Sequence, residues 1–256
     1  MQAPVDRIDS LSPLPHIRHV EASRPLLWLA RGWDDLRHNA GPSLAHGFLL
    51  AALGWLILFA FSTHIDLVAA AISGFLLVGP VFGAAFYELS RLRAAGKPAT
   101  FDASLDGATF HARALVTLGL ILAALAIAWV LVSGVLFERA FGGNLPAITE
   151  SPWRTVLDWD ARFYATYLAT GAIFAVVAFV ISAVSAPLIF DGKQNTRTAI
   201  QTSVRTVALN PAAMSLWALI IAVLVAIGFA TFLLGLIVVL PLLGHGTWHA
   251  YKDLIE

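Results

Sequence analysis

The sequence ALVTLGLILAALAIAWVLVSGVLF, residues 114–137, contains no charged side chain over 24 residues. A bilayer's hydrocarbon core is about 30 Å thick, and a helix needs about 20 apolar residues to cross it. Similar apolar runs occupy residues 43–61, 67–86 and 163–190, and a longer one covers residues 212–248. The longest run exceeds one span, so we expect it to form two short spans with a turn near residues 228–234. The sequence therefore predicts six membrane-spanning helices.

The composition agrees with a membrane protein. Hydrophobic residues make up 59% of the chain and charged residues only 12%, against about 25% charged residues in a soluble domain. The formal net charge is zero, which gives no bias toward nucleic acid as a partner. The absence of cysteine excludes disulfides, iron–sulfur clusters and thiolate metal sites. We predict an all-α, polytopic bundle over residues 42–256, preceded by a cytoplasmic tail with an interfacial helix over residues 1–41.

The positive charges in the loops predict the orientation. Thirteen lysines and arginines lie in the tail, in the loops after the second and fourth spans, and at the C-terminus, whereas the other side holds only Arg139, Arg154 and Arg162. Cytoplasmic loops carry the excess of positive charge, so both termini are expected in the cytoplasm. The one sizeable outer loop is then residues 138–161, interpreted as an amphipathic lid. Residues 1–41 lack a signal peptide's apolar segment, so the first span is expected to act as an uncleaved insertion signal.

Two short amphipathic segments precede pairs of spans. Residues 26–36 place apolar side chains at helical spacing opposite Arg31, Asp34 and Asp35, and residues 198–209 show a comparable pattern. Helices of this kind lie in the membrane interface. We expect both segments to be helical and to lie along the cytoplasmic membrane surface.

An internal repeat is visible in the spans. Residues 74–83 and 235–244 share Gly, Val, Pro and Gly at identical spacing, with Tyr87 and Trp248 seven residues after the proline in each copy. A proline, Pro187, also lies late in the fourth span. The chain is expected to be built from helical hairpins with breaks at Pro80, Pro187 and Pro241, as two or three copies.

The C-terminal segments resemble a known family. These are Thr202-Ser-Val-Arg, Asn210-Pro211, Trp217-Ala-Leu, Gly228-Phe-Ala-Thr and Pro241-Leu-Leu-Gly-His-Gly-Thr-Trp-His-Ala-Tyr251. Together with Arg31-Gly-Trp-Asp-Asp-Leu, they resemble the bacterial family of predicted integral membrane proteins called domain of unknown function 2189. The resemblance runs from about Trp28 to Leu254. It implies a multi-pass protein of the bacterial inner membrane with no assigned function, although some members are labelled as cytochrome c oxidase subunits.

The candidate chemistry centres on His245 and His249, which share one helix face. Two imidazoles at this spacing could bind a metal or haem, with further ligands from His46, Glu88 or His111, predicted at the same depth. The simpler interpretation is a hydrogen-bonded polar cluster near the interface, because a polar group beside hydrocarbon needs a partner. We expect at least two of these five side chains within hydrogen-bonding or one-water reach of each other. Glu88 could also pair with Arg91.

The pattern as a whole favours a non-enzymatic membrane protein. Nucleotide-binding loops, zincin motifs and nucleophile elbows are absent from the sequence, and the middle of each predicted span lacks histidine, which disfavours a catalytic oxidase subunit. We hypothesise a structural, accessory or scaffold role without a cofactor. The alternatives are a small-solute transporter or channel, motivated by the Gly–Pro breaks, and a haem- or metal-binding respiratory accessory subunit. The expected partners are the lipid bilayer and other membrane protein subunits, and no nucleic acid.

Overall fold

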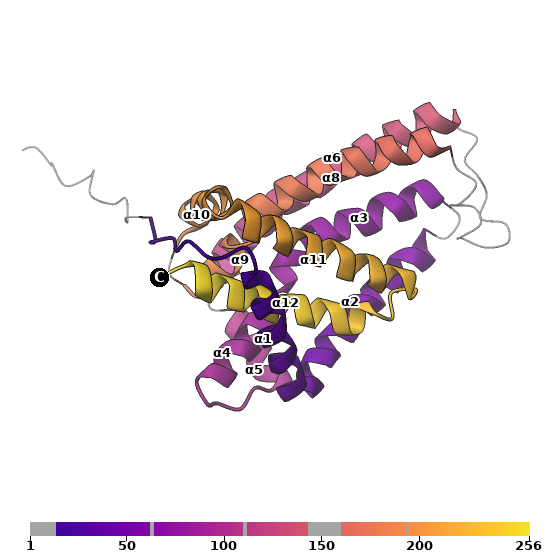
Figure 1. Ribbon diagram of the computed structural model, residues 1–256. Helices are drawn as coiled ribbons and strands as arrows, with labels where there is room; N and C mark the ends of the chain where they lie inside the picture. Colours follow the sequence, from indigo (N-terminus) through magenta and orange to yellow (C-terminus); the bar gives the residue numbers. More distant parts are fainter. Residues whose placement is uncertain (1–13, 62–63, 110–111, 143–159, 193) are drawn as a thin grey trace, which may run out of the picture.

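The computed structural model in Figure 1 describes residues 14–61, 64–109, 112–142, 160–192 and 194–256, and all regular elements in these ranges are helical. Five helical segments are long and apolar enough to cross a membrane: Ala40–Ala60, Asp66–Ala94, Arg113–Phe141, Ala161–Phe190 and Pro211–Ala230. The prediction of an all-α polytopic bundle is confirmed.

The described residues form eleven helices. Their bounds are α1 Arg24–His38, α2 Ala40–Ala60, α3 Ile65–Phe82, α4 Ala84–Ala94, α5 Phe101–Thr109, α6 Ala112–Phe141, α8 Ala161–Ser182, α9 Ser185–Phe190, α10 Thr196–Leu209, α11 Pro211–Ala230 and α12 Leu236–Leu254. In Figure 1, α6 and α8 lie side by side, whereas α1, α4, α5, α10 and the end of α12 gather at one end of the bundle. We call this end the termini side. The predicted lid falls largely on residues 143–159, outside the described residues.

Both predicted short helices are present as α1 and α10. The buried side of α1 includes Trp28 and Leu36, and this helix packs along α12. The first turn of α10 is capped by Asn195, whose side-chain oxygen accepts a hydrogen bond from the Thr198 amide at 3.0 Å. Helical periodicity was therefore a sufficient signal for these segments, and their placement on a membrane surface stays a prediction.

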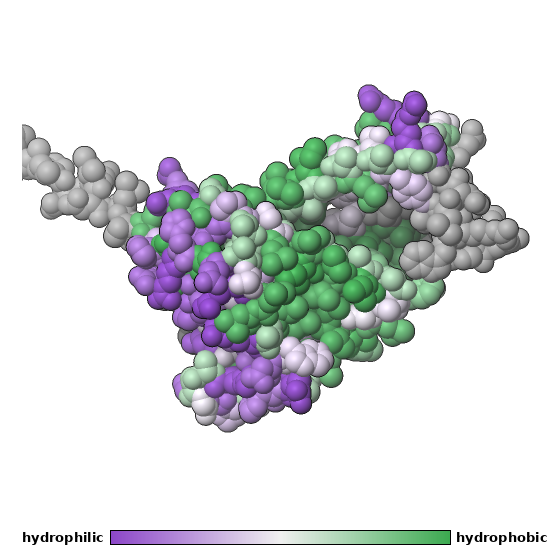
Figure 2. Space-filling model, viewed as in Figure 1, coloured by the Kyte–Doolittle hydropathy of each residue, from purple (hydrophilic) through white to green (hydrophobic). Residues whose placement is uncertain are grey.

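The surface carries an apolar band. Figure 2 shows hydrophobic residues across the middle of the molecule, with hydrophilic residues over the termini side and at the far tip of the bundle. Large apolar side chains are exposed on successive spans, including Phe59, Leu120, Leu131, Leu168 and Ile173. Contiguous apolar surface of this extent is rare on soluble monomers and is expected where helices face lipid.

The three expected helix breaks differ from one another. Pro80 lies inside α3, and the break comes three residues later, at Gly83. The interruption near Pro187 falls earlier, at Ala183 and Val184, between α8 and α9. The break predicted at Pro241 is not observed, because α12 continues without interruption from Leu236 to Leu254. Proline removes one amide donor and one helical hydrogen bond, and here the surrounding packing holds the helix together.

The final helix is the sixth apolar segment of the sequence. The turn before it occupies residues 231–235, close to the predicted 228–234. α12 is not among the five candidate spans, because its second half carries His245, His249, Lys252 and Asp253. Its end returns to the start of the described chain, where Ile17 and Ile255 form an antiparallel bridge and the Arg18 amide donates to the Leu254 carbonyl at 2.9 Å.

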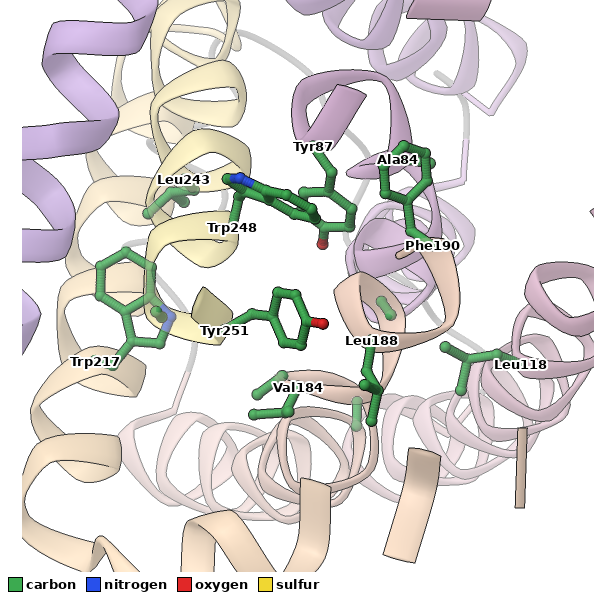
Figure 3. Close-up of a cluster of buried hydrophobic side chains, with 14 of the residues drawn as sticks. Ala84, Tyr87, Leu118, Val184, Leu188, Phe190, Trp217, Leu243, Trp248 and Tyr251 are labelled. Atoms are coloured by element: carbon green, nitrogen blue, oxygen red, sulfur yellow. The ribbon is translucent and has the colours of Figure 1, made fainter. Parts of the chain in front are cut away.

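Aromatic side chains fill the core on the termini side. Tyr87 from α4, Phe190 from α9 and Trp248 from α12 contact one another, with ring centroids 5.8 to 6.1 Å apart (Figure 3). Tyr251 lies against Trp248 at 5.5 Å. Helices far apart in the sequence thus meet at one set of rings, which fixes the ends of α4, α9 and α12 relative to each other.

Candidate functional site

Asp35 of α1 is the hub of a buried polar cluster on the termini side. Its side chain is only 6% exposed. One carboxylate oxygen, Oδ2, accepts hydrogen bonds from the Ser90 hydroxyl at 2.5 Å and pairs with His249 Nε2 at 2.8 Å. The other, Oδ1, accepts from the Arg93 guanidinium at 2.6 Å. The carboxylate thereby joins α1 to α4 and to α12.

His245 extends this cluster into the bundle. It is fully buried, with Nδ1 2.7 Å from the Ser90 hydroxyl and Nε2 3.0 Å from the Ser43 hydroxyl of α2. Because Ser90 gives its proton to Asp35, it must accept from Nδ1–H, which leaves Nε2 to accept from Ser43. Each group therefore donates a hydrogen bond to the next one in the chain, from Ser43 through His245 and Ser90 to Asp35. We call Ser43, His245, Ser90, Asp35, His249 and Arg93 the polar cluster.

Close helix crossings bring the members of the polar cluster together. At Gly32, a Cβ atom would lie 2.7 Å from the Gly246 amide nitrogen and 2.9 Å from the Leu242 carbonyl oxygen, so α1 and α12 touch through their backbones. At Gly47, a Cβ would lie 2.1 Å from the Ile237 carbonyl oxygen, so α2 is equally close to α12. These approaches explain why glycine is needed at both crossings. They place the serine of α2 and the aspartate of α1 beside the histidines of α12.

The electrostatics of the polar cluster favour an ionised Asp35. Burial alone would raise the pKa of the Asp35 carboxyl, but hydrogen bonds from His249 and Ser90, together with the charges of His249 and His245, more than offset it. The net result is a pKa below the ordinary value of 3.8. A charge-assisted network of this kind is stabilising only while every member keeps its partner.

The polar cluster contains the residue types of a hydrolase active site, but a substrate cannot reach them. Serine, histidine and aspartate lie in one hydrogen-bonded chain, yet Ser90 stands between His245 and Asp35, and Ser43 is completely buried at the start of α2. A nucleophile must meet a substrate carbonyl, and general-base geometry needs the reacting groups within about 3 Å. The arrangement is therefore suited to holding helices together.

The other sequence-predicted residues lie in separate contacts. His46 bonds to the Ser104 hydroxyl at 2.7 Å and stacks on Phe101 at 4.3 Å between ring centroids. Glu88 is buried and forms two hydrogen bonds with Arg91, at 2.6 and 2.8 Å. No hydrogen bond or ion pair between described residues joins Glu88 to His249, which the repeat had placed together. His111 lies outside the described residues.

The two histidines of α12 do not form a metal centre with other described residues. His245 has both ring nitrogens occupied by serine hydroxyls, and His249 Nε2 is held by Asp35. Across the described part of the chain, no group of three or more histidine, aspartate or glutamate side chains could hold a metal ion. The metal or haem interpretation therefore gains no support from the geometry. Sequence reasoning missed Asp35, Ser43, Ser90 and Arg93 as the partners of these histidines.

A second feature is an apolar cavity of about 560 Å³. It lies between α3, the start of α4, α8, α11 and α12, with one residue of α2, and its lining is almost entirely aliphatic and aromatic. Pro80 and Gly83 line it, whereas Pro187 and Pro241 do not. The cavity therefore contacts only one of the three prolines at which breaks were expected.

Comparison with known proteins finds a similarity for part of the chain. Searches among curated proteins and among solved structures found no match. Residues 67–191, from α3 to the end of α9, match a family model described as "Predicted integral membrane protein (DUF2189)". The match confirms the resemblance seen in the sequence, although it excludes the C-terminal segments that suggested it. Over residues 67–191 this chain is similar to the predicted integral membrane protein family of domain of unknown function 2189.

Proposed function

We propose that this multi-pass membrane protein is a non-enzymatic accessory or scaffold protein of the bacterial inner membrane. The observation that carries the proposal is the state of the polar cluster. Ser43, Ser90 and His245 are at most 2% exposed, and their polar groups are satisfied by each other and by Asp35. Side chains that could perform chemistry are thus used to join helices and are out of reach of a substrate.

The proposed topology has six crossings, with both termini in the cytoplasm. α12 contains 19 residues, or about 29 Å at 1.5 Å per residue, close to the bilayer core of about 30 Å. Its polar half is covered by protein, since His245, Trp248 and Tyr251 are buried. The pairing of residues 17–18 with residues 254–255 supports an even number of crossings. The excess of lysine and arginine on the termini side supports its cytoplasmic location.

A two-copy internal repeat remains part of the proposal. It is supported by the contact between Tyr87 and Trp248, the two residues that follow the repeat prolines at the same distance and whose rings lie 6.1 Å apart. When two copies of a repeat pack against each other, residues at equivalent positions can come into contact.

Transport of a small polar solute is the weaker alternative. A pathway for such a solute would present polar side chains or unpaired carbonyls along a cavity. The cavity described above is apolar and is lined by Pro80 but by neither of the other two prolines. The apolar lining of this cavity supports contact with hydrocarbon instead of with a polar solute.

Solubilising the protein from its native membrane in a mild detergent would test the accessory role. We expect the 27.4 kDa chain to migrate in a defined complex with another membrane protein at fixed stoichiometry, and to dissociate from it in harsher detergent. Recovery of the chain alone under the mild condition would contradict the proposal. Solute uptake by liposomes containing the purified protein would favour the transporter alternative.

A further inference from the structure

The apolar cavity lies in the half of the bundle nearer the termini side. Its lining on α8 runs from residue 172 to residue 182, and on α3 and α4 from residue 75 to residue 87, in each case toward the termini side. On α12 it includes Leu240, Leu243, Gly244 and Thr247. The volume of about 560 Å³ is within the range of small-molecule sites, roughly 300–1,000 Å³.

Small side chains create the hollow. α8 contributes Ala172, Ala175 and Ala178 to its wall, and α11 contributes Ala218 and Ala222. At Gly79 of α3, which also lines the cavity, a Cβ atom would meet nothing within 4 Å. A run of alanines on two facing helices leaves room that larger residues would fill, so the volume is a consequence of sequence.

The polar side-chain groups in the lining are three hydroxyls and the Trp217 indole nitrogen. Ser182, Thr247 and Tyr87 bring hydroxyls, but each hydroxyl donates to a backbone carbonyl, at 2.6, 2.7 and 3.4 Å respectively. No charged side chain lines the cavity. Its occupant must therefore be hydrocarbon over its whole buried length.

The dimensions of the cavity indicate which hydrocarbon group can occupy it. The α8 wall spans 10 residue steps, about 15 Å at 1.5 Å per residue, or roughly half of the 30 Å bilayer core. A partner's transmembrane helix would cross the whole core, about twice the length of this lining. A single chain whose carbons keep contacts of about 3.5–4.0 Å fits.

We propose that this cavity binds one acyl chain of a membrane phospholipid from the leaflet on the termini side. The chain enters between α8 and α11, fills the space beside Gly79 and ends near the middle of the bilayer, beside Phe75 and Ala172. The headgroup stays outside, at the level where α8 gives way to α9. Binding requires no polar contact inside the cavity.

A photoactivatable phospholipid with a diazirine on its acyl chain, reconstituted with the full-length protein, tests the proposal. Cross-links mapped by mass spectrometry are expected to concentrate on cavity residues of α8 and α11. Ala222→Phe should fill the cavity and lower cross-linking there at least fivefold. Ala226→Phe is the matched control, because Ala226 is exposed on the same helix and does not line the cavity, and it should leave the yield unchanged.

Gly79→Leu gives a second filling variant if Ala222→Phe does not fold. Cross-links spread evenly over all exposed apolar residues would overturn the proposal, since they would show ordinary surrounding lipid. Equal yields in Ala222→Phe and the wild type would do the same. Displacement of the probe by a long-chain isoprenoid quinone, at concentrations where added phospholipid has no effect, would also contradict an acyl chain as the occupant.

Discussion

Replacing Asp35 with alanine removes the one carboxylate that joins α1, α4 and α12. The change leaves the Ser90 hydroxyl without its acceptor, and Ser90 is only 2% exposed, so water cannot replace Asp35 there. An unsatisfied buried donor costs about 1–3 kcal/mol. His249 also loses its carboxylate partner, and Arg93 loses one of two, since it still pairs with Asp34. Their side chains are 23% and 25% exposed and can be partly rehydrated. They add less than about 1 kcal/mol each.

The expected loss in the free energy of unfolding is therefore about 2–4 kcal/mol, near the cost of about 3–5 kcal/mol for breaking a buried ion pair. The neighbouring residue supplies a matched control. Asp34 also pairs with Arg93, at 2.5 Å, but its side chain is 70% exposed. Asp34→Ala should cost no more than about 1 kcal/mol.

Equilibrium unfolding in mixed micelles, with increasing SDS and tryptophan fluorescence as the signal, measures both variants. Trp28 of α1 is fully buried and hydrogen-bonded to Asp253 of α12 at 2.8 Å, so its emission reports separation of these helices. If Asp35→Ala and Asp34→Ala fell within about 1 kcal/mol of each other, the hub role of Asp35 would be refuted.

Further predictions concern a helix crossing and pH. Gly47→Ala places a Cβ 2.1 Å from the Ile237 carbonyl oxygen and should destabilise the protein by at least about 1–3 kcal/mol in the same unfolding assay. Gly41→Ala, in the same helix with nothing within 4 Å, should be neutral or slightly stabilising, and equal losses for the two would count against the crossing. Because the folded-state pKa of Asp35 is lowered, its stabilising contribution should be fully present above pH 3.8 and be lost as the pH falls through the lower folded-state value. Asp35→Asn should remove this part of the acid sensitivity, and an unchanged pH profile of unfolding would argue against an ionised Asp35.

The spans and the two short amphipathic helices could be predicted because their signals are local. An apolar run such as residues 114–137 can be recognised as a span from its own residues, without reference to the rest of the chain. The turn at residues 231–235 followed from length alone, since 37 apolar residues exceed one crossing. The pairing of Glu88 with Arg91 was also accessible, because residues three apart lie on the same face of a helix.

The polar cluster could not be predicted in the same way. Ser43, Ser90 and His245 belong to three different helices, and each is an ordinary residue in its own segment. Only the packing of α1, α2 and α4 around α12 gives them a shared location. Spacing relative to Pro80 and Pro241 suggested instead that Glu88 and His249 would meet. The helix breaks at Gly83 but continues through Pro241, and the two side chains have different neighbours, Gly107 of α5 for Glu88 and Asp35 of α1 for His249.

The proposed crossing by α12 is the central feature of the six-span topology, because it puts the turn before α12 and the C-terminus on opposite sides of the membrane. The native chain has no cysteine, so single cysteines placed at Leu234, in the turn before α12, and at Glu256 can each be labelled alone. A maleimide that does not cross membranes, added to intact cells and then to permeabilised cells, distinguishes the two sides. We predict labelling of Leu234→Cys in both conditions and of Glu256→Cys only after permeabilisation. Labelling of both positions in intact cells, or of neither, would place them on one side and contradict the six-crossing bundle.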